Sequence, residues 1–140
     1  MRNRKKMLIG GGLLVLISLI GFTLHGQGSM VRINEFMALN NNTLQDEDGD
    51  YSDWIELYNA GAEPVDLTDW TLTDDPADLQ KWTIPAVEID AHGFLLIFAS
   101  GKDRQTAGSE LHTNFKLSGA GEYLALFNPD GTAVTAFDPS

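Results

Sequence analysis

Apolar and polar residues alternate in short runs from residue 31 onward, and turn residues separate one run from the next. β-branched and aromatic side chains dominate these runs, and none sustains the i, i+3, i+4, i+7 repeat of an amphipathic helix. The pattern predicts an all-β domain. The predicted strands cover residues 31–38, 54–60, 70–73, 81–84, 94–99, 114–117, 122–128 and 132–137.

Two segments also predict how the strands are arranged. Residues 94–99, FLLIFA, are apolar throughout, which is typical of a strand covered on both faces at the centre of a sheet. Pro129, Asp130 and Gly131 join the last two strands closely enough for a hairpin. Eight short strands at this spacing favour an immunoglobulin-like two-sheet β-sandwich.

The N-terminal part of the chain has a different pattern. Residues 7–24 carry no charge, and a helix over this stretch would be about 27 Å long, enough to cross a bilayer. Arg2, Arg4, Lys5 and Lys6 precede it and should remain in the cytoplasm. We therefore expect residues 1–28 to be one hydrophobic helix, either an uncleaved membrane anchor or a signal peptide, and residues 29–140 to be an exported domain.

Charge is distributed unevenly between these two parts. The chain has a formal net charge of -11, but all 20 acidic residues follow residue 34. Without residues 1–28, five basic residues remain against 20 acidic ones, a net charge of 5 - 20 = -15. Such a surface repels nucleic acid and attracts cations. The chain also has no cysteine, so its stability depends on packing or on a bound ion.

The segment DEDGDYSD, residues 46–53, contains candidate ligands for a metal ion. Asp46, Asp48 and Asp50 alternate, and hard oxygen ligands at this spacing suit Ca²⁺. The EF-hand pattern fails, because Gly49 precedes the third acid and Leu57 stands where the bidentate glutamate belongs. The alternative is a solvated loop with a turn at Asp48 and Gly49.

A predicted strand pairing enlarges this candidate site. If residues 54–60 and 70–73 pair as antiparallel neighbours, the acids after the second strand lie beside the acidic loop. The candidate calcium ligands are then Asp46, Asp48, Asp50, Asp53, Asp74 and Asp75. The strand at 31–38 would place this acidic end about 25 Å further from a membrane anchor.

Other residues with possible functions have ordinary structural interpretations. Trp54, Trp70 and Trp82 would form a sugar-binding platform if exposed, or core packing if buried. Three scattered histidines without cysteine argue against a transition-metal site, and hydrogen bonding to backbone explains His112. The serine-hydrolase, zinc-protease and phosphate-loop motifs do not occur in the sequence, so we expect no catalytic activity.

Several segments together resemble the bacterial lamin-tail domain family. They are INEFMALN at 33–40, DWIELYNAGAEPVDLTDWTLTDD at 53–75, KWTIP at 81–85, FLLIFASGKD at 94–103 and HTNFKLSGAGEYLALFNPDG at 112–131. The resemblance implies an immunoglobulin-like β-sandwich of exported or cell-surface bacterial proteins, with no catalytic residues. It also implies a chain that usually continues beyond the last strand seen here, often joined to enzymes such as spore-coat kinase-like or nuclease domains.

These observations leave three functions open. The first is a non-catalytic module, tethered or secreted, that contacts a cell-envelope polymer or protein and is stabilised by Ca²⁺ if the acidic loop binds it. The second is an accessory domain at the N-terminus of a larger exported enzyme, of which this chain would be a fragment. The third is a carbohydrate-binding module, which requires an exposed tryptophan.

Overall fold

The computed structural model describes residues 30–139. This part of the chain contains ten β-strands and no helix, which confirms the prediction of an all-β domain. The strands are β1 (Val31–Met37), β2 (Asp53–Asn59), β3 (Val65–Asp66), β4 (Thr71–Thr73), β5 (Trp82–Thr83), β6 (Glu88–Ile89), β7 (Phe94–Ala99), β8 (Leu111–His112), β9 (Leu124–Phe127) and β10 (Ala133–Phe137).

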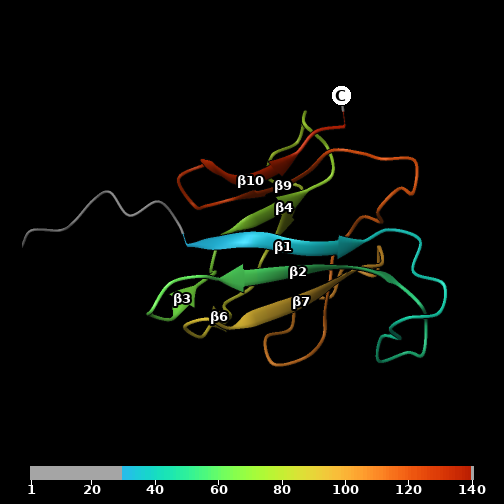
Figure 1. Cartoon of the computed structure of the whole chain (residues 1–140), viewed down its shortest axis with the longest axis horizontal. Coiled ribbons are helices and arrows are strands. Elements are labelled where there is room, and N and C mark those ends of the chain that lie inside the picture. Colours follow the sequence, from blue (N-terminus) through green and yellow to red (C-terminus); the bar gives the residue numbers. More distant parts are fainter. Residues whose placement is uncertain (1–29, 140) are drawn as a thin grey trace, which may run out of the picture.

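Eight of these ten strands form two four-stranded sheets, and the longer of them can be followed in Figure 1. One has the order β1-β2-β7-β8 and is antiparallel except for the β7–β8 pair, and the other has the order β10-β9-β4-β5. The edge strands β1 and β10 lie next to each other, and the backbone N–H of Ile33 donates a hydrogen bond to the Thr135 hydroxyl. The predicted hairpin is confirmed, because β9 pairs with β10 across the turn at Gly131.

The hydrophobic core lies between these two sheets. Ile55, Leu57 and Ile97 from the first sheet pack in one cluster with Leu72 and Leu126 from the second, and all five side chains are fully buried. Ile55 and Leu57 of β2 both face this core, because every second side chain of a strand lies on the same side of the sheet. The strands with the clearest apolar pattern in the sequence therefore supply the centre of the core.

A third, two-stranded sheet closes one end of the molecule. β3 pairs with β6, and neither strand has more than two residues. Asn59, at the end of β2, is fully buried and its side-chain amide donates hydrogen bonds to the backbone carbonyls of Glu63, Ile89 and Asp90. The amide thereby ties this small sheet to the main one.

Segments between strands cover parts of the outer sheet faces. In the first sheet, Trp54, Phe98 and His112 are neighbours across β2, β7 and β8. Because paired residues project to the same face, and Ile55 and Ile97 face the core, this row lies on the outer face. All three side chains are nevertheless buried.

Three predictions about strands are wrong in detail. Residues 114–117 form no strand, and Lys116 makes only an isolated bridge with Ser100. β7 is interior to its sheet, but its first residue, Phe94, is 59% exposed, and β8 pairs only with Ile97 and Phe98. Finally, β2 and β4 belong to different sheets, so the predicted pairing of residues 54–60 with 70–73 does not occur.

The predicted signal peptide or anchor at residues 1–28 lies outside the described residues. Among residues 30–139, no helix is long and apolar enough to cross a membrane.

Candidate functional site

The acidic loop between β1 and β2 is organised around the carboxylate of Asp46. One carboxylate oxygen, Oδ1, accepts hydrogen bonds from the backbone N–H groups of Asp48 and Asp50, each at 3.1 Å. The other oxygen accepts the Ser52 hydroxyl at 2.7 Å. Gly49 closes a turn by donating its N–H to the Asp46 carbonyl, with a φ of 82° that suits glycine. The turn predicted at Asp48 and Gly49 is therefore confirmed.

A lysine from a distant part of the chain lies among the three aspartates. The Lys102 ammonium is 2.7 Å from carboxylate oxygens of both Asp46 and Asp48, and 2.9 Å from Asp50. The Asp46 side chain has no exposed surface, and that of Lys102 is 21% exposed. The three carboxylates that the sequence offers to Ca²⁺ therefore already share an internal cation.

These contacts shift the acidity of both partners. Burial alone would raise the pKa of Asp46, but hydrogen bonds from Lys102, Ser52 and two backbone amides outweigh it and lower that pKa to about 2. Burial likewise disfavours the charged form of Lys102, yet its three aspartate partners raise its pKa above the ordinary value. Both groups are thus ionised across the physiological pH range.

Arg104 extends this ion-pair cluster toward the solvent. Its guanidinium donates one hydrogen bond to Glu47 at 2.6 Å and another to Asp48 at 2.7 Å. Hydrogen bonds from Lys102 and Arg104 lower the pKa of Asp48. Two cations from the segment after β7 therefore hold the loop that precedes β2.

The other predicted calcium ligands make separate contacts. Asp53 accepts the backbone N–H of Asn40 at 2.9 Å, Asp74 pairs with Lys81 at 2.6 Å, and Asp75 accepts the backbone N–H of Ala77 at 2.8 Å. Only Asp46, Asp48 and Asp50 of the six come together as a possible ligand group within the described residues. Calcium binding there is a prediction from the sequence alone, and Lys102 competes for the same three carboxylates.

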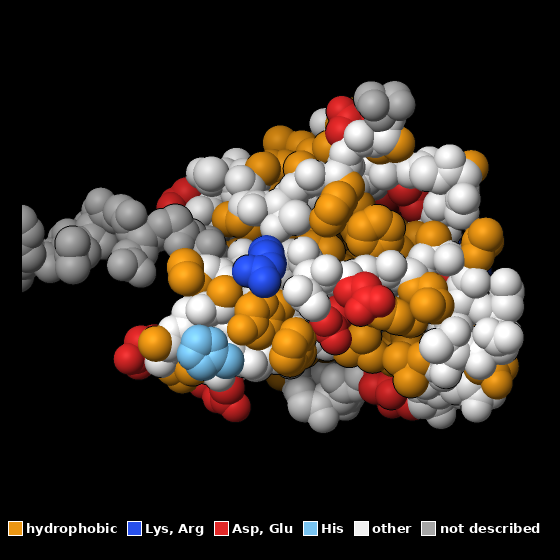
Figure 2. Space-filling model, in the orientation of Figure 1, with side chains coloured by type: hydrophobic (Ala, Val, Ile, Leu, Met, Phe, Trp, Pro, Cys, Tyr) orange, Lys and Arg blue, Asp and Glu red, His pale blue; other side chains and the backbone are white. Residues whose placement is uncertain are grey.

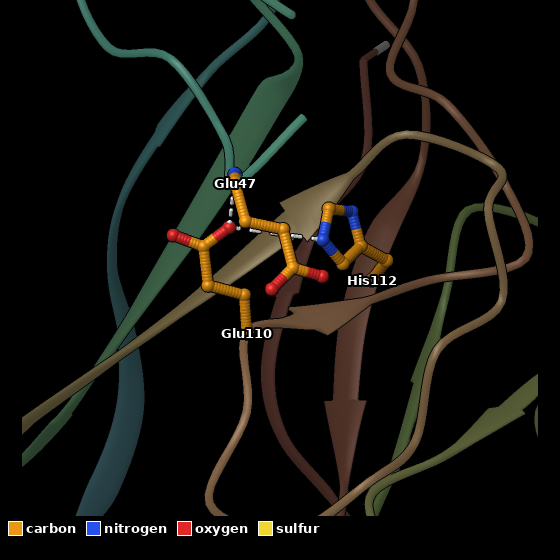
Figure 3. A group of neighbouring side chains, drawn as sticks. All are labelled: Glu47, Glu110 and His112. Carbon is orange, nitrogen blue, oxygen red and sulfur yellow. Dashed lines mark hydrogen bonds and ion pairs between the residues drawn. The ribbon is translucent and has the colours of Figure 1, made fainter. Parts of the chain in front are cut away.

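A second group of side chains beside the loop was missed by the sequence reasoning. His112 is fully buried, and its Nδ1 lies 2.9 Å from the Ser100 hydroxyl. Its other ring nitrogen, Nε2, is buried without a hydrogen-bond partner, and the nearest carboxylate oxygen, on Glu110, is 3.9 Å away. Glu47 completes the group (Figure 3). The only hint of this cluster in the sequence is Glu110, two residues before His112. β8 has just two residues and carries no periodic signal.

Ser100, His112 and Glu110 have the composition of a hydrolase triad but not its geometry. In such triads the serine contacts Nε2 of the histidine and the acid contacts Nδ1, so that the exposed hydroxyl is activated. Here Ser100 contacts Nδ1, is itself buried, and accepts the backbone N–H of Lys102. Ser100 therefore orients the imidazole and offers no accessible nucleophile.

The tryptophans do not form an exposed platform. Trp54 is 8% exposed, Trp70 6% and Trp82 1%. Trp82 also donates its indole N–H to Asp103 at 3.2 Å. The carbohydrate-binding alternative required an exposed tryptophan, and it loses that support.

Other hydrophobic side chains lie on the surface among acidic ones (Figure 2). The exposed hydrophobic residues include the aromatic residues Phe36, Phe94 and Phe137.

The family comparison agrees with this all-β fold. The model of the lamin tail domain, an immunoglobulin-like family without enzymatic function, matches residues 26–140. The match covers most of the chain, so the protein belongs to the lamin tail domain family. No curated protein matches the chain closely enough to serve as a relative.

Proposed function

We propose that this protein is a non-catalytic interaction and structural module that acts outside the cytoplasm. Family membership supports the non-catalytic part. Export is supported by the sequence of residues 1–28, with its basic start and its uncharged run.

The observation that carries this proposal is the position of the two ends of β1. The backbone N–H of Ala60 donates to the carbonyl of Met30, so the chain enters the domain beside the end of β2. The acidic loop begins after the other end of β1, at the opposite side of the molecule (Figure 1). A seven-residue strand spans about 23 Å.

This arrangement gives the module an attachment end and a contact end. If residues 1–28 lie in or near a membrane, the acidic loop points away from the lipid and meets partners first. Its aspartates are held by Lys102 and Arg104, so the loop presents a fixed shape to a cell-envelope polymer or protein. Preorganised surfaces of this kind lose less conformational freedom on binding.

Cysteine labelling in cells that express the full chain tests the proposal. The chain has no native cysteine, so Asn42→Cys in the acidic loop and Ala62→Cys near the attachment end each report one exposed position. A membrane-impermeant maleimide should label both in intact cells. A bulky maleimide should react faster at position 42, which is further from the membrane. Labelling only after lysis would refute export, and faster reaction at position 62 would refute the orientation.

A further inference from the structure

The imidazole of His112 is directed at two carboxylates but bonded to neither. The side chain is fully buried, stacked on Phe98 with ring centroids 5.3 Å apart, and fixed through Nδ1 by Ser100. Its Nε2 faces the Glu110 carboxylate at 3.9 Å, which is too long for a hydrogen bond (Figure 3). A buried ring nitrogen without a partner is costly, so Nε2 is available to a further partner.

The two glutamates complete a convergent set of donor atoms. Glu110 immediately precedes β8, and Glu47 comes from the acidic loop, whose backbone N–H at position 47 donates to the Glu110 carboxylate at 2.6 Å. One atom from each glutamate and one from the imidazole lie within 4.8 Å of one another. Both glutamate side chains are about two-fifths exposed, so an ion from solvent can reach them, whereas His112 is buried and fixed.

The surrounding charge favours a cation. The acidic loop and its neighbours bring together Asp46, Glu47, Asp48, Asp50 and Glu110 against Lys102 and Arg104. Five negative and two positive groups leave a net charge of -3. Arg104 binds one oxygen of Glu47, which leaves the second oxygen available.

We infer that His112, Glu47 and Glu110 form a binding site for a divalent transition-metal ion of the Zn²⁺ type. Imidazole nitrogen with two carboxylates is a donor set that Zn²⁺ accepts, with water at the fourth position, whereas Ca²⁺ prefers oxygen alone. In the bound state Nε2 gives its lone pair to the metal, and Nδ1 carries the proton and donates to Ser100. That hydrogen bond is the outer-shell contact that fixes metal-binding histidines.

This site differs from the predicted calcium site in both ligands and metal. The Lys102 ammonium forms ion pairs with Asp46, Asp48 and Asp50, and within the described residues no hydrogen bond or ion pair joins it to Glu110 or His112. The inference therefore holds whether or not the aspartates bind Ca²⁺.

Zinc titration of the full chain tests the inference. The protein is stripped with EDTA and titrated with Zn²⁺ against a chromophoric chelator at neutral pH, with Ca²⁺ as the comparison ion. We expect one Zn²⁺ per chain and a change in the ¹⁵N chemical shift of His112 Nε2. Glu110→Gln and His112→Gln should each weaken the affinity at least about tenfold.

Matched controls separate this site from adventitious binding. His92→Gln alters an exposed histidine, and His25→Gln removes the third; neither should change the zinc affinity. The Glu110 side chain is 40% exposed, so Glu110→Gln keeps the fold even if the buried His112→Gln variant does not. Absence of zinc binding, or binding that survives Glu110→Gln and is lost with His92 or His25, would overturn the inference.

Discussion

The ammonium nitrogen of Lys102 lies 2.7 Å from a carboxylate oxygen of Asp46, although the two residues are 56 positions apart in the chain. Asp46 in turn accepts the backbone N–H groups that shape the acidic loop. One buried ion pair thus connects the conformation of the loop before β2 to the segment after β7. Several measurable properties depend on this pair.

Replacing Lys102 should destabilise the domain strongly. In Lys102→Met, the Asp46 carboxylate stays buried and loses its only side-chain cation among the described residues, which should lower the free energy of unfolding by about 3 kcal/mol. Urea denaturation of the full chain measures the loss. Lys116→Met, at an exposed lysine, is the control and should cost less than about 0.5 kcal/mol. Equal effects of the two variants would contradict the role assigned to the Lys102 contacts.

The same variant should respond to calcium when the native protein does not. With Lys102 present, we expect similar melting temperatures in EDTA and in about 1 mM Ca²⁺, because the ammonium already occupies the carboxylates. In Lys102→Met, Ca²⁺ should raise the melting temperature. A calcium-dependent rise in the native protein that Asp48→Asn abolishes would instead show that Ca²⁺ displaces the lysine.

The ion pair should also set the acid stability. The pKa of Asp46 is lowered from 3.8 to about 2 in the folded protein, so the folded state favours the ionised form. The resulting stabilisation, roughly 2 kcal/mol, is complete above about pH 4 and is lost as the pH falls toward 2. Denaturation in EDTA from pH 5 to pH 2 should show this loss, and Asp46→Asn should flatten that part of the curve. An unchanged slope in the variant would exclude Asp46 as its source.

Asn59 should be more important for stability than its polar side chain suggests. Asn59→Ala removes three hydrogen bonds to backbone carbonyls and one from the Gly61 N–H, all near the two-stranded sheet. Buried polar groups left unpaired are costly, so we expect a loss of roughly 3 kcal/mol in chemical denaturation. Asn42→Ala, in the exposed part of the acidic loop, should be nearly neutral. A small effect at Asn59 would mean that water replaces the amide.

Tryptophan fluorescence should report complete burial of the three indoles in the described domain. Acrylamide should quench the emission weakly in the native protein and strongly in denaturant, because every tryptophan is less than a tenth exposed. N-acetyltryptophanamide gives the reference for full exposure. Efficient quenching in the native state would restore the possibility of an aromatic binding platform.

The sequence alone determined the elements whose pattern is local. Alternating side chains along β2, the run at β7 and the turn residues before β10 each identify a strand or hairpin, because a buried sheet face and a tight turn impose their own residue choices. The family resemblance, confirmed by the match over residues 26–140, also required no coordinates.

Only the tertiary structure decided which distant residues meet. Strand pattern does not specify a partner, so β4 was assigned to the wrong neighbour, and Asp74 and Asp75 were grouped with the acidic loop. Two-residue strands such as β8 are too short to show a period, so the burial of His112 was missed. The charge of each residue can be read from the sequence. The position of Lys102 among the aspartates, and of His112 Nε2 opposite the glutamates, depends on contacts between segments far apart in the chain.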